Sequence, residues 1–127
     1  MPAIIRLIGV YNAKGTLSGE LAYFVGKRLG RAHCALCDVT HGLVRERKDW
    51  QASRTRLPVP FETYHLDDVP AAVRAGFDEA PVVLAETHDG VTVLLAAGEL
   101  EACHGDPERL VAAIEASVIA HELSWPG

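Results

Sequence analysis

Two cysteines and a histidine lie close together in the first third of the chain, at the spacing of a metal-binding motif. Cys34 and Cys37 form a Cys-x2-Cys pair, and His41 follows four residues later. A short Cys-x2-Cys turn can direct two thiolates at one point, and an imidazole is a third ligand of the kind that tetrahedral Zn²⁺ prefers. These residues predict a zinc site. The alternative is that the cysteines are small buried hydrophobic residues and the histidine is a surface group.

Thiol–disulfide exchange is a second chemistry open to the same pair. The chain has three cysteines, an odd number too small for a secreted disulfide framework, and a close pair in a reducing compartment indicates metal or redox chemistry. A neighbouring cation or a helix N-terminus could lower the pKa of one thiol. For the third cysteine, Cys103, we expect burial in the core.

A weak anion site is predicted where the first strand passes into a helix. Lys14, Gly15 and Thr16 lie at this point, and the free N–H groups of a helix N-terminus favour an anion. The lysine precedes the glycine, so the order differs from that of a phosphate-binding loop, and we do not expect nucleoside triphosphate hydrolysis. Thr16 also fits the role of a helix cap.

Charge is distributed unevenly along the chain. Residues 1–66 carry ten Lys/Arg and five Asp/Glu, whereas residues 67–127 carry two and twelve, and the net charge of −5 disfavours nucleic-acid binding. One stretch surrounds Trp50 with five cations, which suggests self-association or a protein partner: Arg45, Arg47, Lys48, Arg54 and Arg56. Trp50 could stack on a ring-bearing ligand, but the heptad spacing of Trp50 and Leu57 favours an amphipathic helix packed on the body.

Hydrophobic periodicity and turn residues predict an α/β fold with the order β-α-β-α-β-β-α. The apolar, β-branched run over residues 3–11 is typical of a central strand covered on both faces, and Asp89-Gly90 between two β-rich runs predicts a hairpin. Asp106-Pro107 predicts the start of the last helix. The remaining elements are expected over residues 17–29 (helix), 59–66 (edge strand after Pro58, with Pro60 inside it), 71–77 (short helix opened by Asp67, Asp68 and Pro70) and 98–104 (helical turn).

A long connection interrupts this pattern. Residues 1–127 are expected to form a single domain, in which residues 31–58 are an inserted basic segment that contains the Cys/His cluster. Connections of this length without structure are uncommon in compact domains. We therefore expect a helix near residues 48–56 within it.

The order of elements resembles the thioredoxin-like fold. The likeness rests on the β-α unit of residues 4–29, on Ala80-Pro81-Val82 where that fold places a cis-proline before its third strand, on Asp89-Gly90, and on residues 105–110. The resemblance implies a four-stranded mixed sheet with flanking helices. Redox members carry Cys-x-x-Cys at the first helix N-terminus, but here residues 14–19 contain no cysteine. A redox site would therefore use Cys34, Cys37 and Pro81.

Topology offers His88 as a fourth metal ligand. If the first two strands are parallel, the connection that follows the first helix reaches the second strand at its N-terminal end. The third strand runs antiparallel in the thioredoxin-like order, so its end at His88 would lie at that side, near Cys34, Cys37 and His41. His88 as an exposed turn residue is the alternative. The opposite end should gather His65 and the segment around Pro81.

The sequence thus predicts a small cytoplasmic metal-binding module, with zinc as the ion and a thiol–disulfide oxidoreductase as the alternative. No apolar run reaches the length that spans a bilayer, and the first residues lack the pattern of a signal peptide. We expect no membrane partner.

Overall fold

The computed structural model describes residues 2–11 and 48–126. Several predictions fall between these ranges and lie outside the described residues. They are the helix over residues 17–29, the anion site at Lys14, Gly15 and Thr16, the Cys34, Cys37 and His41 cluster, and the cations Arg45 and Arg47.

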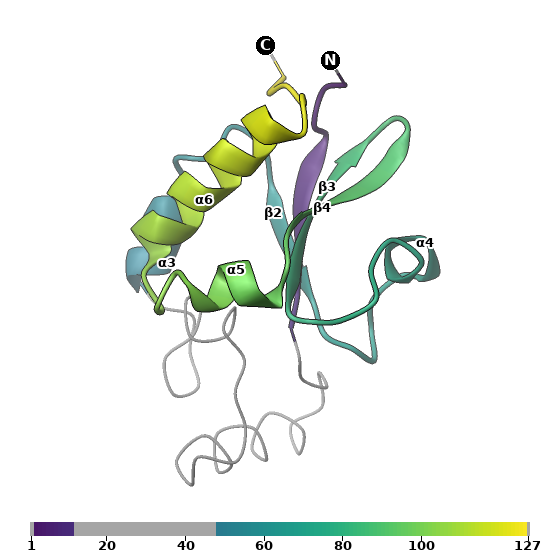
Figure 1. The fold of residues 1–127 in the computed structure, drawn as a ribbon, viewed down its shortest axis with the longest axis horizontal. Helices are drawn as coiled ribbons and strands as arrows, with labels where there is room; N and C mark the ends of the chain where they lie inside the picture. Colours follow the sequence, from purple (N-terminus) through teal and green to yellow (C-terminus); the bar gives the residue numbers. More distant parts are fainter. Residues whose placement is uncertain (1, 12–47, 127) are drawn as a thin grey trace, which may run out of the picture.

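Four strands form one mixed sheet, in the order β2-β1-β3-β4. They are β1 (Arg6–Val10), β2 (Phe61–Tyr64), β3 (Val82–Thr87) and β4 (Gly90–Leu95). β1 is parallel to β2, and β3 is antiparallel to both β1 and β4. With helices on its two faces, this sheet confirms the predicted fold class (Figure 1).

Strand β1 is central and covered on both faces, as its apolar run predicted. Leu7 belongs to the apolar cluster on one face of the sheet, and Ile8 belongs to the cluster on the other face. Both side chains are fully buried, because β2 and β3 flank the strand and helices cover each side. The edge prediction for β2 is also confirmed, with Pro60 immediately before its first residue.

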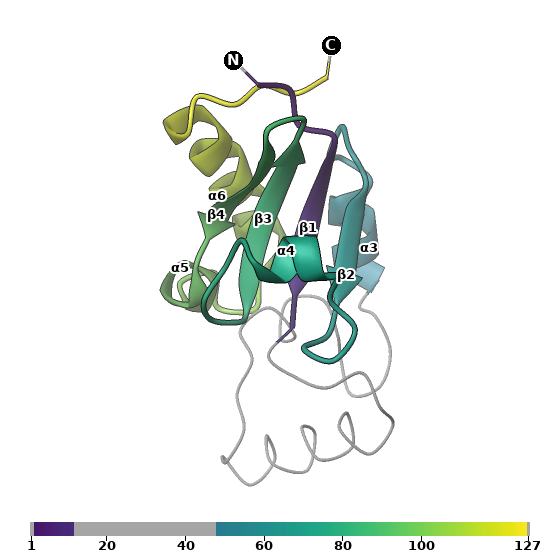
Figure 2. The same cartoon turned by 90° about the vertical axis from the view of Figure 1, so that its right-hand side faces the viewer.

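The helices divide unequally between the two faces (Figure 2). Helices α3 (Lys48–Arg54), α5 (Ala97–Glu101) and α6 (Pro107–Ala120) lie on one side, and α4 (Ala71–Arg74) lies on the other. The first side buries the larger cluster, which includes Trp50, Leu110 and Ile114. None of these helices, which are those of the described ranges, is long and apolar enough to cross a membrane.

Helix α6 begins where the sequence predicted. The Asp106 carboxylate accepts a hydrogen bond from the Glu108 N–H at 2.9 Å, and Pro107 occupies the first helical position. This cap satisfies an N–H group that has no partner within the helix. The predicted stripe of Leu110, Ile114 and Val118 is buried against the sheet.

Helix α4 is shorter than the predicted helix over residues 71–77. Its cap residue is Pro70, and its first turn contains no acidic side chain. The Asp68 carboxylate accepts a hydrogen bond from the His65 N–H at 2.6 Å, so it stabilises the turn after β2 and not the helix. After the helix, the backbone at Gly76 comes close to the sheet: a Cβ atom there would lie 2.2 Å from Cγ2 of Val91.

The predicted hairpin is present, with Thr87 paired to Gly90 across the turn. The Ala80–Pro81 peptide bond is cis, as the resemblance implied. The two described ends of the chain also meet (Figure 1): the Ile4 N–H donates to the Ser124 carbonyl, and the Ser124 N–H donates to the Pro2 carbonyl, both at 2.9 Å.

Candidate functional site

Tyr11 lies with two predicted residues, His65 and Pro81, at the carboxyl-terminal edge of β1 and β2. Val10 pairs with Tyr64 on one side and with Val82 on the other, so Tyr11, His65 and Pro81 occupy neighbouring positions one step further along. The Tyr11 and His65 rings lie 5.2 Å apart between centroids. This arrangement confirms that His65 and the segment around Pro81 share one end of the sheet.

His65 lies beside a carboxylate at this edge. Its Nδ1 lies 3.5 Å from Oδ2 of Asp68, and its side chain is about one-quarter exposed. Tyr11 is buried next to it, and Pro81 is buried on the other side of Tyr11, before β3. A carboxylate next to an imidazole fixes the orientation of the ring, so the edge presents a held histidine to solvent.

Cys103 is a buried free thiol and not part of this edge site. Its side chain is 3% exposed, and its Sγ lies 3.6 Å from the Glu99 carbonyl oxygen, to which it donates. Burial raises the pKa of the thiol, and the positive charge of Arg109 opposes this effect. The next residue, His104, is exposed with φ of 51°. The prediction that Cys103 is a core residue is confirmed.

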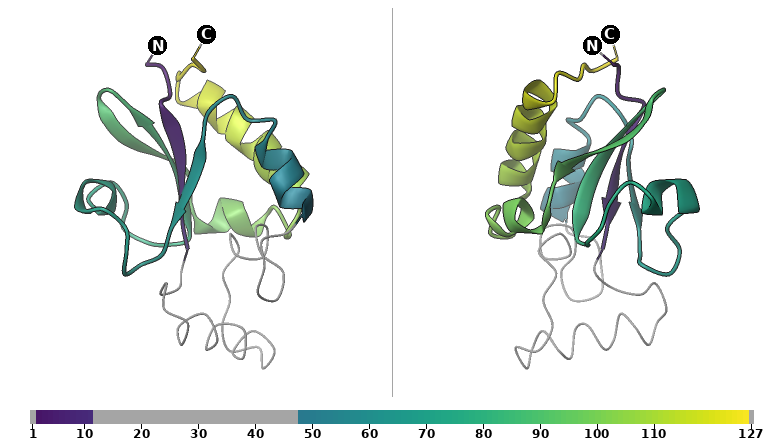
Figure 3. Two further views of the ribbon diagram at one scale, coloured as in Figure 1. Left: turned by 180° about the vertical axis from the view of Figure 1, so that it is seen from behind. Right: turned by 45° about the vertical axis from the view of Figure 1, so that its right-hand side comes forward.

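The described residues contain no group of three or more His, Cys, Asp or Glu side chains placed to hold a metal ion. His88 is exposed in the hairpin turn, at the end of the sheet opposite to Tyr11 and to the start of α3 (Figures 1 and 3). Helix α3 follows residues 34–41 in the sequence and leads into β2. Residues 34–41 lie outside the described ranges, so His88 as a ligand beside Cys34, Cys37 and His41 stays a prediction.

Trp50 is not a surface residue, which corrects its place in the predicted partner surface. Its side chain is 0% exposed and packs edge-on against Phe61, with centroids 5.0 Å apart. It cannot stack on a ligand ring or contact a partner. Trp50 fixes α3 to the sheet, as the amphipathic interpretation predicted, while Lys48 and Arg56 remain exposed.

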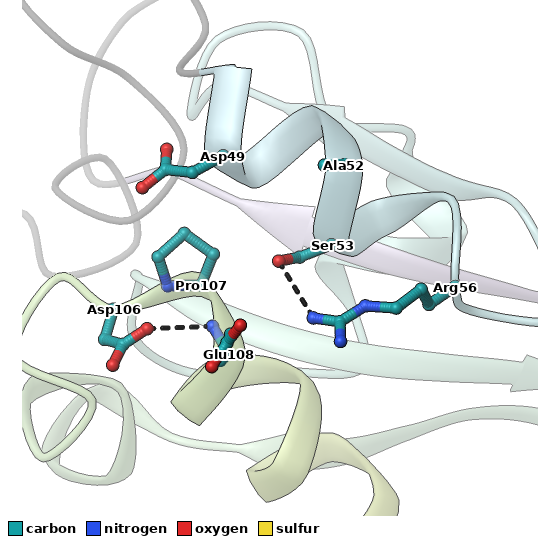
Figure 4. A pocket seen from close by; sticks show the side chains of 7 residues that line it. All are labelled: Asp49, Ala52, Ser53, Arg56, Asp106, Pro107 and Glu108. Atoms are coloured by element: carbon teal, nitrogen blue, oxygen red, sulfur yellow. Dashed lines mark hydrogen bonds between the residues drawn. The ribbon is translucent and has the colours of Figure 1, made fainter.

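A hollow of about 420 Å³ lies between α3 and the start of α6 (Figure 4). The Arg56 guanidinium donates to Oγ of the buried Ser53 at 3.2 Å. The residues that line this hollow include three carboxylates and one guanidinium, so the hollow does not suit an anion. The lining residues are Asp49, Ala52, Ser53, Arg56, Asp106, Pro107 and Glu108.

Sequence reasoning missed a charged cluster on the α4 side of the sheet. Arg6 of β1 forms ion pairs with Glu62 of β2 and Glu86 of β3, and it donates to the Tyr64 hydroxyl at 3.1 Å. Hydrogen bonding to Glu86 is the largest cause that raises the pKa of Arg6. An arginine inside an apolar central strand was the available signal, because such a charge needs partners on its neighbours.

The protein belongs to the class of α/β folds and has a four-stranded mixed sheet. The chain matches no protein-family model, no curated protein and no solved structure in the comparisons made. The class is defined by the strand order and by the helices on the two faces.

Proposed function

We propose that the protein is a small cytoplasmic zinc-binding module in which Cys34, Cys37 and His41 hold the ion. The observation that carries the proposal is the Cys-x2-Cys-x3-His spacing. Thiolate and imidazole ligands together favour zinc over the harder cations, which prefer oxygen. The ion would stabilise the segment that carries these residues.

The body of the protein is proposed to be thioredoxin-like. The strand order β2-β1-β3-β4 and the position of Pro81 directly before β3 support this finer assignment. The described chain stops at Tyr11 and resumes at Lys48, and both lie at the carboxyl-terminal edge of β1 (Figure 3). This edge is where open α/β sheets usually bind ligands.

His88 is the sequence candidate for the fourth coordination position, and it is exposed in the hairpin turn. If His88 is the fourth ligand, His88→Ala should bind the metal more weakly. Unchanged metal binding in this variant would make His88 an ordinary exposed turn residue.

Elemental analysis of the full chain, purified without added metal, tests the zinc site. We expect about one zinc per chain, as for a structural site with thiolate ligands. The double variant Cys34→Ser/Cys37→Ser should lose the metal and His41→Ala should bind it more weakly, whereas Cys103→Ser should retain it. Metal-free wild-type protein of ordinary stability, or zinc retained in the double variant, would overturn the proposal.

A thiol–disulfide oxidoreductase is the second candidate, favoured by the placement of Pro81 beside Tyr11 and His65. In this reaction a thiolate of Cys34 or Cys37 attacks a substrate disulfide, and the other cysteine then releases the reduced substrate as the pair becomes oxidised. Cys103 is a slow internal reference, because burial raises the pKa of its thiol. After chelation, alkylation of Cys34 or Cys37 faster than Cys103, with cycling by a dithiol, would support it. Equal rates would exclude it.

A further inference from the structure

The two edges of the sheet differ in how they resist pairing with another chain. β2 is short, follows Pro60 and carries Glu62. β4 has the sequence Gly-Val-Thr-Val-Leu-Leu, with neither charge nor proline, and it lies at the opposite edge (Figure 2). Charged side chains and prolines are the usual protection of an edge strand. β4 lacks both.

The backbone polarity of β4 follows from the pairing of β3. The Glu86 carbonyl accepts a hydrogen bond from the Ile5 N–H at 2.7 Å, so Glu86 directs its backbone groups toward the β1 side. The pair Glu86 and Val91 is therefore a non-hydrogen-bonded pair, and Val91 directs its N–H and C=O to the outer edge. Because this pattern repeats every second residue, Val93 does the same.

The stretch available for pairing ends after Val93. The register of β3 and β4 shifts at this point, and the Leu94 carbonyl accepts a hydrogen bond from the Ser117 hydroxyl at 2.8 Å. The hairpin before it projects away from α6 (Figure 1). Residues 91–93 therefore form a short, uncharged stretch of edge with outward donors and acceptors at both ends.

We propose that β4 pairs in antiparallel fashion with β4 of a second copy of this chain, about a two-fold axis at Thr92. Val91 then lies opposite Val93 of the second copy, and each such pair exchanges two backbone hydrogen bonds. Thr92 faces Thr92 of the second copy, a favourable cross-strand pair. A second copy fits because the stretch is self-complementary under this axis and places no like charges opposite each other.

The contact is small, which sets the strength of the association. Each copy contributes three residues, Val91, Thr92 and Val93, and these are already half-buried before pairing. The surface area that pairing buries is therefore less than the ~1,200 Å² at the lower limit of stable interfaces. The dimer is therefore populated only at high protein concentration. It does not depend on the metal site.

Sedimentation analysis of the full chain over the micromolar to millimolar range tests this pairing. Wild-type protein should show a reversible monomer–dimer equilibrium. Thr92→Lys and Thr92→Glu should each be monomeric, because like charges then face each other at the axis, and an equimolar mixture of the two should regain a heterodimer. The matched control is Thr63→Lys on the opposite edge strand, which should dimerise as the wild type does.

Circular dichroism should show the same fold for all variants, because Thr92 is only half-buried and Thr63 is exposed. A wild type that stays monomeric throughout would overturn the proposal and leave the edge to a different partner. So would a dimer that persists in Thr92→Lys, or a mixture that fails to associate. Association that high salt abolishes and Thr92→Lys does not change would assign it instead to the basic residues.

Discussion

Arg6 carries its charge near the centre of the sheet, with a carboxylate on each neighbouring strand. Its side chain is 22% exposed and pairs with Glu62 and Glu86. These partners raise the pKa of Arg6 above its ordinary value. A raised folded-state pKa contributes stability that is fully present below the unfolded-state pKa and is lost only as pH rises through the folded value. While its carboxylate partners stay charged, the contribution of this arginine is therefore constant from neutral to moderately alkaline pH.

Replacing Arg6 should expose the repulsion between its two partners. Arg6→Met is expected to lower the free energy of unfolding by about 1–3 kcal/mol at neutral pH, because two carboxylates lose their charged hydrogen bonds. Urea denaturation measures this.

Arg109→Met is the control for this prediction. Arg109 lies 3.7 Å from Asp106, but its side chain is 60% exposed, and exposed pairs of this kind contribute at most ~1 kcal/mol. Equal losses in the two variants would contradict a structural role for the Arg6 cluster.

Gly76 and Gly98 provide opposite predictions for the same substitution. A Cβ at Gly76 would overlap Val91, whereas no atom of the described residues lies within 4 Å of a Cβ at Gly98. Gly76→Ala should destabilise the fold by about 1–3 kcal/mol, because Val91 must move. Gly98→Ala, within α5, should stabilise it by about 0.5–1 kcal/mol. Thermal denaturation of both variants checks the signs, and a stabilised Gly76→Ala would contradict the close packing of α4 on β4.

At the scale of elements, α3 depends on one buried aromatic residue. Trp50 packs on Phe61 across the helix–sheet contact, and its indole N–H has no hydrogen-bond partner among residues 2–11 and 48–126. The helix is short, so tertiary packing and not intrinsic propensity must hold it in place.

The loss of stability on replacing Trp50 should therefore depend strongly on whether the new side chain keeps an aromatic ring. Trp50→Ala is expected to cost about 3–5 kcal/mol, as for other large-to-small core changes. Trp50→Phe should cost far less, because no hydrogen bond is lost and the edge-on ring contact remains. Chemical denaturation gives both values, and tryptophan fluorescence should lose its buried, blue-shifted component in Trp50→Phe. Equal costs would contradict the ring contact as the anchor of α3.

The elements that the sequence predicted well have local signals. The hairpin follows from Asp89-Gly90, and the start of α6 follows from Asp106-Pro107, because a few adjacent residues decide each one. The length of α4 was not predictable in this way. The chain leaves the helix at Ala75, and the next residue, Gly76, lies against Val91 of β4, a contact distant in the sequence.

At the scale of the whole molecule, the basic and acidic halves of the sequence meet within one chain. Arg56 from the basic stretch shares a hollow with Asp106 and Glu108 from the acidic half (Figure 4). Part of the charge contrast thus reflects neighbouring surfaces of one body and not two separate binding faces.

Topology predicted the edge site only in part. His65 and Pro81 lie at the same end of the sheet, because His65 follows β2, which is parallel to β1, and Pro81 precedes β3, which is antiparallel to β1. The order and directions of the strands alone imply this. The pairing of His88 with the Cys/His cluster stays a prediction, because the cluster lies outside the described residues, whereas the helix expected near residues 48–56 is present as α3. The Arg6 cluster depends on register, which the sequence does not specify.

Native mass spectrometry of the full chain, purified without added metal, tests the central claim most directly. The zinc proposal predicts a main species heavier than the apo chain by one zinc ion, which converts to the apo mass on acidification with three free thiols. It also predicts that the Cys34→Ser/Cys37→Ser variant shows only the apo mass. A wild-type chain that carries only its apo mass, and whose stability does not change when zinc is supplied, would contradict it.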